Sequence, residues 1–231
     1  MKNLNDILWV PLDLPSVPGD LKLENISYTF VPDLDKDKKQ QLRDQRKHHL
    51  YVWNSFRLRI PRDNVEQPYD EQVSDVDWIW TEEALSICPA LIDYIETYLP
   101  FKKLKYVAAI SSRGEVPMHF DHKENISEIE KQFYKSNDPY YYRLLLDGTI
   151  NDNTFYVYTK TLGKKYCKLP DNSPGWAMGS YSCAHGNDEP LSGQKLLLYV
   201  MGDIDTSRHL DLVERSYNKF REYAIVRDYA V

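Results

Sequence analysis

Cysteine is scarce in this chain of 231 residues: only Cys88, Cys167 and Cys183 are present. Their odd number and wide spacing allow neither a disulfide framework nor a paired CxxC zinc motif. Small secreted domains often depend on such frameworks. We therefore expect the protein to work in a reducing compartment, the cytoplasm.

Long hydrophobic runs are also missing. The longest plain apolar stretch is LLLYVM at residues 196–201, whereas a membrane-spanning helix needs about 20 such residues. The first residues, MKNLNDILWVPLDLPSVPGD, carry acids and prolines where a signal peptide has an apolar run. These features predict a protein without membrane association.

The chain has no excess of positive charge. Lysine and arginine number 29 against 35 acidic residues, which gives a net charge of −6. Because binding to a phosphate backbone needs a positive footprint, this balance argues against nucleic acid as the main partner. Tyrosine, by contrast, is abundant at 18 residues, which favours a β-rich protein.

Three regions can be distinguished within what we expect to be one compact domain. Residues 1–102 are predicted to be extended and helical, with a surface arm over 1–20 and a helix over 81–99 that Thr81 caps and Pro89 interrupts. Residues 103–205 are predicted to form the core. Residues 206–231 contain apolar side chains at helical spacing, which predicts a closing helix.

The central region has the texture of short strands separated by turns, which is typical of a sandwich or jelly roll. The predicted strands lie near 104–111, 116–121, 140–147, 154–160, 164–169, 175–180, 182–185 and 195–202. The fold class expected is therefore mainly β with flanking helices.

The segment VPMHFDH, residues 116–122, contains an HxD pair. On a strand, residues two apart point to the same face, so His119 and Asp121 can aim into one space. Such a pair is weak by itself, since polar strand ends facing water give the same pattern. A third ligand would strengthen it.

His185, in YSCAHGND at residues 181–188, supplies that third ligand. Two imidazoles and one carboxylate on one face of a metal form the facial triad of non-haem Fe(II) oxygenases, which leaves positions open for a cosubstrate and oxygen. Zinc accepts the same ligands, so the triad alone does not name the metal. Asn187 and Asp188 follow and could orient His185 or shape the turn.

Lys195 comes ten residues after His185, at the start of the apolar strand KLLLYV. One interpretation is a lysine at a strand end that reaches water. The other is a lysine that points inward, where a buried ammonium needs an anionic partner.

The ordered set HxD, distal histidine and later basic residue resembles the 2-oxoglutarate/Fe(II)-dependent oxygenases over roughly residues 104–205. The resemblance implies a double-stranded β-helix, a jelly roll of the cupin type. It implies that His119, Asp121 and His185 bind Fe(II) and that Lys195 holds the far carboxylate of 2-oxoglutarate. With O2, the family hydroxylates its substrate and releases succinate and CO2.

Arg143, in the apolar segment YYYRLLLDG at 140–148, suggests a branch. The order of motifs resembles the aspartyl/asparaginyl β-hydroxylase group, which includes free-proline cis-hydroxylases and has an arginine facing the active site. The animal aspartyl hydroxylases, however, lack the carboxylate ligand found here as Asp121, and use arginine where this chain has Lys195. The expected substrate is a small-molecule amino acid or a peptide or protein.

The substrate-binding residues expected are Arg143, Trp176 and Tyr142. For Trp176 and Tyr142 the alternative is packing in the core, and for Arg143 it is an ion pair with a structural acid such as Asp147 or Asp203.

Other functions remain compatible with the motif. A metal-dependent cupin isomerase or lyase would use the same triad without needing Lys195. A nucleic-acid demethylase would be expected to carry a further arginine pattern after the distal histidine, where this chain has GNDEPLSGQK. A non-catalytic jelly-roll binding module would leave the three ligand residues exposed or separately hydrogen-bonded.

Overall fold

Strands dominate the computed structural model of this chain. It describes residues 6–22, 52–62, 77–113, 116–119, 141–150, 155–159, 161, 163–179, 184–188 and 195–227. The strands are β1 (Ile7–Pro11), β2 (Val52–Pro61), β3 (Trp78–Trp80), β4 (Phe101–Arg113), β5 (Val116–His119), β6 (Tyr141–Asp147), β7 (Phe155–Thr159), β8 (Gly163–Tyr166), β9 (Gly175–Met178), β10 (His185–Asn187), β11 (Lys195–Ile204) and β12 (Ile225–Val226). The helices in these ranges are α3 (Glu82–Ile87), α4 (Pro89–Tyr98) and α6 (Thr206–Lys219).

The strands β4 to β11 are paired as one long hairpin that has been rolled up. β4 pairs with β11, β5 with β10, β6 with β9 and β7 with β8, and every pair is antiparallel. The order within the large sheet is β12-β1-β9-β6-β11-β4-β2-β3, and within the small sheet β5-β10-β7-β8. This nested pairing over two sheets is the jelly-roll arrangement, so the predicted fold class is confirmed.

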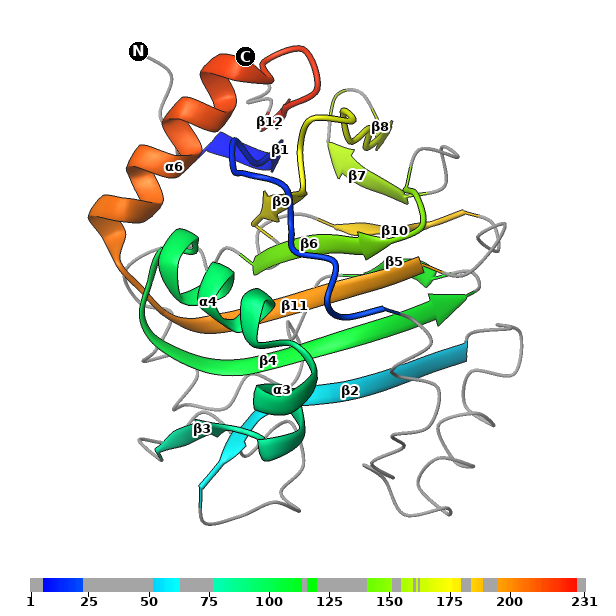
Figure 1. Cartoon of the computed structure of the whole chain (residues 1–231). Coiled ribbons are helices and arrows are strands. Elements are labelled where there is room, and N and C mark those ends of the chain that lie inside the picture. Colours follow the sequence, from blue (N-terminus) through cyan, green and yellow to red (C-terminus); the bar gives the residue numbers. More distant parts are fainter. Residues whose placement is uncertain are drawn as a thin grey trace, which may run out of the picture.

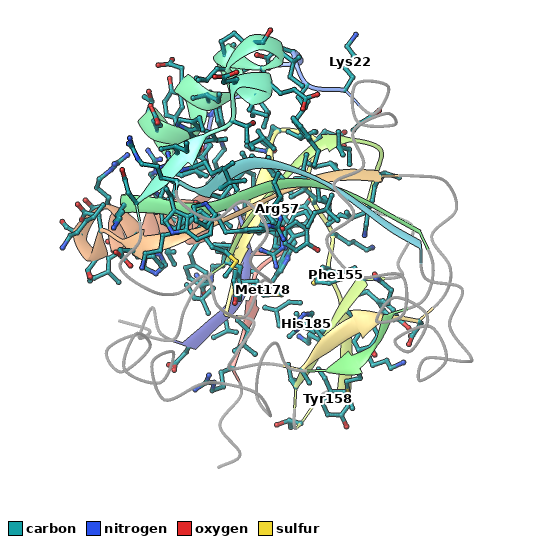
Figure 2. The ribbon with its side chains drawn as sticks, turned by 90° about the horizontal axis from the view of Figure 1, so that it is seen from below. Lys22, Arg57, Phe155, Tyr158, Met178 and His185 are labelled. Atoms are coloured by element: carbon teal, nitrogen blue, oxygen red, sulfur yellow. The ribbon has the colours of Figure 1, made fainter. Side chains whose placement is uncertain are left out.

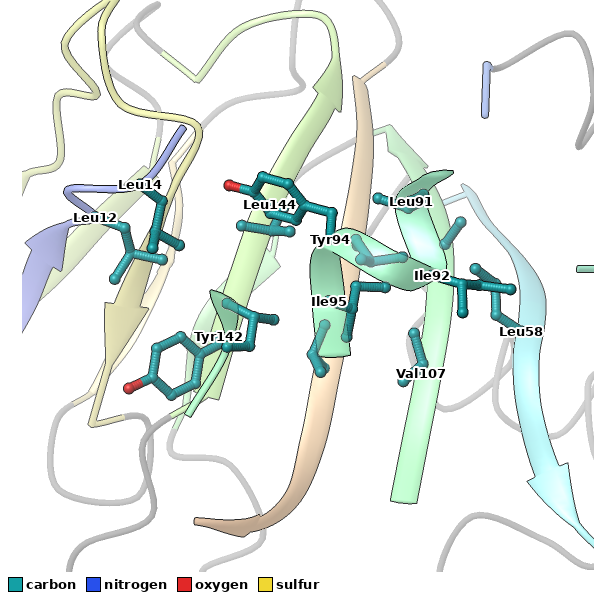
Figure 3. Packing of buried hydrophobic residues seen from close by; sticks show 14 of the residues in the cluster. Leu12, Leu14, Leu58, Leu91, Ile92, Tyr94, Ile95, Val107, Tyr142 and Leu144 are labelled. Carbon is teal, nitrogen blue, oxygen red and sulfur yellow. The ribbon is translucent and has the colours of Figure 1, made fainter. Parts of the chain in front are cut away.

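The two faces of the large sheet have different neighbours. The helices α3, α4 and α6 lie on one side of it, and the small sheet lies on the other (Figure 1). On the helix side, Leu91 and Ile95 of α4 pack with Tyr142 and Leu144 in the main hydrophobic core (Figure 3). We call this the outer face of the large sheet, and the side toward the small sheet its inner face.

Local sequence signals account for the helices. The Thr81 hydroxyl accepts a hydrogen bond of 3.1 Å from the Ala84 amide, which caps α3 as predicted. Pro89 divides the expected helix into α3 and α4, since proline is tolerated in the first turn of a helix and breaks its interior. None of the described helices is both long and apolar enough to cross a membrane.

The structure corrects the prediction of a surface arm over residues 1–20. Ile7–Pro11 is fully buried and forms strand β1, which pairs with β9 and β12 of the large sheet. Asp20 then accepts hydrogen bonds from the Ala90 and Leu91 amides at the start of α4. The prolines in this segment suggested an exposed chain, but its apolar residues, from Ile7 to Val10, are part of the core.

Candidate active site

Alternation along each strand decides which residues point into the space between the two sheets. On β6, Tyr142 and Leu144 belong to the core on the outer face, so Arg143 between them lies on the inner face. On the small sheet, Val157 packs with Trp176 of the large sheet in a second apolar cluster between the sheets. The candidate site occupies this inner space.

His119 and His185 are Cα partners on the neighbouring strands β5 and β10. Residues directly opposite each other on antiparallel strands share a face of the sheet, with Cβ atoms about 4.5–5.5 Å apart. His185 is 6% exposed, and its side chain is directed toward the large sheet (Figure 2). The backbone thus brings together the two histidines of the predicted triad.

The carboxylate of the predicted triad cannot be placed in the same way. Asp121 lies outside the described residues, as does the side chain of His119. Among the residues that the structure does describe, no three His, Cys, Asp or Glu side chains are grouped closely enough to hold a metal ion. The metal ligand set stays a prediction.

His185 has two neighbours that shape its surroundings. The Phe155 ring lies 6.2 Å from the imidazole, centroid to centroid, on the adjacent strand β7. Asn187, two residues further along β10, is 6% exposed, and its Oδ1 has no hydrogen-bond partner within the described part of the chain. A buried acceptor of this kind is costly unless a donor such as a bound ligand or water satisfies it.

Lys195 is the first residue of β11 and is only 5% exposed. The expected alternative of a lysine that reaches water at a strand end is therefore wrong. On β11, Lys195 alternates with Leu196 and Leu198, which belong to the outer core. It therefore shares the inner face with Leu197 of the cluster between the sheets. Its proposed role toward 2-oxoglutarate is not tested by this position.

Arg143 lies at the centre of a row of cross-strand partners on the inner face. It is paired with Tyr199 of β11 on one side and with Trp176 of β9 on the other. Its guanidinium carbon is 3.5 Å from the centroid of the Tyr199 ring and 4.9 Å from that of Tyr141. Such cation–π contacts hold the guanidinium in place without neutralising its charge.

Arg143 forms no ion pair with an acidic side chain among the described residues. Arg143 is 6% exposed, and its Nη1 has no hydrogen-bond partner there. Of the two acids considered as structural partners, Asp203 pairs with Lys105 at 2.9 Å, and Asp147 is exposed and accepts from the Gly148 amide. The structural ion pair with either acid is therefore excluded.

Trp176 lies on the inner face and is 3% exposed. Its ring lies 6.0 Å from Phe155 and 6.5 Å from Trp9, centroid to centroid. It packs in the apolar cluster, as the core alternative expected, but its buried Nε1 has no acceptor among the described residues. Gly175 allows this approach of β9 to β6, because a Cβ there would lie 2.0 Å from the Arg143 carbonyl oxygen.

The structure corrects the assignment of Tyr142 to the substrate pocket. Tyr142 is fully buried on the outer face, where its hydroxyl shares a hydrogen bond of 2.6 Å with Nδ1 of His209 on α6. Burial lowers the pKa of His209 to about 4, so this histidine is neutral at physiological pH. Tyr142 and Arg143 are adjacent on one strand and cannot both face the site.

Arg57 is a residue of the inner face that the sequence did not single out. It is 7% exposed and alternates on β2 with Phe56 and Leu58 of the outer core. Its side chain lies above the small sheet that carries His185 and Phe155 (Figure 2). The alternation of Phe56, Arg57 and Leu58 was a signal that could have identified it.

Comparisons with known proteins give a likeness in structure but none in sequence. No family model matches the chain, and no curated protein matches it in sequence. The chain is similar to a crystal structure from Burkholderia pseudomallei, described as an oxidoreductase of the 2OG-Fe(II) oxygenase family, with a TM-score of 0.40 and 9% sequence identity. The match covers 75% of this chain and 85% of that chain. The jelly-roll assignment comes from the strand order of this chain itself.

Proposed function

We propose that this protein is an Fe(II)- and 2-oxoglutarate-dependent oxygenase that hydroxylates a carboxylate-bearing amino acid, free or within a peptide. The observation that carries the proposal is the pairing of His119 with His185 across β5 and β10. Two imidazoles on one face, completed by Asp121 two residues after His119, are a donor set suited to Fe(II) with positions left open.

The buried polar groups of the inner faces of the two sheets fit a site that binds a polar occupant. Lys195, on the inner face of the large sheet, is the candidate for the far carboxylate of 2-oxoglutarate. The Oδ1 of Asn187 and the Nη1 of Arg143 are buried without partners among the described residues. A ligand that donates to the first and accepts from the second would relieve both desolvation costs.

When bound, Fe(II) with 2-oxoglutarate would supply the oxidising chemistry, with succinate and CO2 as products. The residues of the chain hold and orient the reactants. Lys195 fixes the cosubstrate, Arg143 binds a carboxylate of the substrate, and Phe155 and Trp176 form apolar walls that exclude water.

The alternatives fit these observations less well. A cupin isomerase or lyase would have no need of the cosubstrate clamp that we assign to Lys195. A non-catalytic binding module that exposes His185 does not fit, because His185 is 6% exposed and faces the inner space. The acidic net charge of −6 disfavours a nucleic-acid substrate.

The deciding experiment measures succinate release by the Fe(II)-loaded chain with 2-oxoglutarate and O2, alone and with a panel of amino acids and short peptides. We expect slow release without substrate and stimulation by carboxylate-bearing members of the panel. His185→Ala is the matched control, because it removes one proposed ligand. Equal release by parent and variant, or none by the parent, contradicts the proposal.

A further inference from the structure

Five residues of the large sheet form one continuous row across its inner face. Successive Cα pairings join Arg57 to Ala108, Ala108 to Tyr199, Tyr199 to Arg143 and Arg143 to Trp176. We call this set the inner-face row. It brings an arginine from β2, in the N-terminal part of the chain, into line with an arginine from β6.

Both arginines of the row are buried, Arg57 at 7% and Arg143 at 6% exposure. For Arg143, removing the guanidinium group from water is expensive unless an anion meets it. The Nη1 of Arg143 has no partner within the described residues. Arg57 makes contacts of its own, so its importance here lies in its charge, its burial and its register.

The register of the strands sets the separation of the two arginines. The Arg143 guanidinium lies over Tyr199, at 3.5 Å from the ring centroid, and Tyr199 stands between Arg143 and Arg57 in the row. Strands are about 4.8 Å apart, so the Arg143 guanidinium lies roughly two strand spacings, ~10 Å, from the backbone of Arg57. Ala108, the partner of Arg57 in the row, has only a methyl group as its side chain.

We propose that the substrate is a small dicarboxylate, with one carboxylate bound by Arg143 and the second by Arg57. This inference rests on the proposed function, in which Lys195 takes 2-oxoglutarate and leaves both arginines to the substrate. Arginine suits the task because its planar fork binds a carboxylate through two parallel hydrogen bonds. Arg57 is then the residue that selects a dianion over a monoanion.

The test is calorimetric binding of glutarate and adipate, each compared with the monocarboxylate of equal length, valerate and hexanoate. The titrations use the metal-free chain, and the Fe(II)-loaded chain without oxygen and with saturating 2-oxoglutarate. We expect each dicarboxylate to bind the parent at least ten-fold more tightly than its partner. Arg57→Gln should abolish that ratio and leave the monocarboxylate affinities unchanged. Arg143→Gln should weaken the binding of all four ligands.

Two variants serve as controls. Arg62→Gln removes an exposed arginine just after β2, paired with Asp77, and should keep the ratio of the parent. Arg57→Lys retains the charge and should therefore keep most of the affinity ratio between dicarboxylate and monocarboxylate that Arg57→Gln loses. Thermal unfolding of each variant establishes that it is folded before its affinities are compared.

The outcomes separate this inference from the proposed function. A parent chain that does not favour dicarboxylates, or an Arg57→Gln variant that keeps the preference, overturns the inference even if 2-oxoglutarate turnover is found. Loss of glutarate binding in the presence of saturating 2-oxoglutarate also overturns it, because the row would then belong to the cosubstrate. If the preference for dicarboxylates depends on Arg57 but the chain shows no turnover of 2-oxoglutarate, the anion site is supported and the proposed oxygenase function is contradicted.

Discussion

Arg143 and Tyr199 face each other across β6 and β11, and the guanidinium carbon lies 3.5 Å from the centroid of the phenol ring. The ring orients the cation, but a ring face cannot replace a carboxylate as the partner of a buried charge. Arg143 therefore keeps a charge that no described acid neutralises, and substituting it tests whether a carboxylate of the substrate binds there.

Replacing Arg143 with alanine should separate substrate binding from the rest of the reaction. The variant should still bind Fe(II) and 2-oxoglutarate and release succinate slowly without substrate. Because a charge-assisted contact of about 2–5 kcal/mol is lost, substrate-stimulated turnover should fall by at least one to two orders of magnitude. Succinate release with and without substrate measures both quantities.

Two other results for Arg143→Ala would change its role. Loss of the slow background release would assign Arg143 to the cosubstrate. Turnover equal to that of the parent would make it a residue of the fold only. Lys102→Ala, which removes an exposed cation of β4, is the control for a general effect of charge.

Replacing Lys195 with methionine should weaken 2-oxoglutarate binding while metal binding stays nearly intact. Methionine keeps an apolar stem in a position that is 5% exposed, and removes the ammonium. Loss of a buried charge-assisted contact costs about 2–5 kcal/mol, so affinity should fall thirty-fold or more. Calorimetric titration of 2-oxoglutarate into the Fe(II)-loaded, oxygen-free chain measures this.

An exposed lysine gives the comparison for Lys195. Lys165 of β8 is exposed, so Lys165→Met should bind 2-oxoglutarate as the parent does. If Lys195→Met also binds it with the affinity of the parent, the cosubstrate carboxylate is held by another residue.

The strands of the core could be predicted from the sequence, whereas their pairing partners could not. Alternating apolar residues and turns identify a strand wherever it pairs. The prolines of residues 11–18 obscured β1, whose burial depends on a distant partner, β9. The helix break at Pro89 and the cap at Thr81 are local signals and were predicted correctly.

The candidate site shows the same division between local and distant information. The period of two on β6 was enough to exclude either Tyr142 or Arg143 from the inner face, and the outer-face contact of Tyr142 with His209 decides which. The alignment of Arg57 with Arg143 depends on three successive strand pairings between distant segments, and no sequence pattern contains it.

Replacing His185 with alanine should remove metal binding without unfolding the chain. His185 is a Cα partner of His119, and a facial triad that loses one imidazole retains only two ligands. Iron content after anaerobic loading and dialysis should fall from about one ion per chain to near zero. The parent's thermal unfolding midpoint in metal-free buffer is the reference for the fold.

His209 provides a matched histidine outside the site. It is also buried, at 7% exposure, but belongs to the outer face with Tyr142. His209→Gln should therefore load iron as the parent does. Full loading of His185→Ala, or an equal loss of iron in both variants, would contradict the proposed ligand set.

The buried pair of Tyr142 and His209 should make the stability of the protein depend on pH below neutrality. Burial lowers the pKa of His209 from an ordinary 6.5 to about 4. The unfolded chain therefore binds a proton at this histidine between these values, and the folded chain does not. Stability contributed by the neutral imidazole is complete above pH 6.5 and is lost progressively as the pH falls toward 4. At pH 5 the loss should be about 2 kcal/mol relative to pH 7.5.

Urea unfolding between pH 7.5 and 4.5 measures this dependence for the parent and for His209→Gln. The glutamine variant does not titrate at this position. It should be less stable at pH 7.5, because the 2.6 Å hydrogen bond with Tyr142 is altered. Between pH 7.5 and pH 5 the free energy of unfolding should fall for both proteins. The fall should be smaller for the variant than for the parent, by about 2 kcal/mol. Parallel pH profiles for the two proteins would show that His209 titrates normally in the folded state and that the acid sensitivity has another origin.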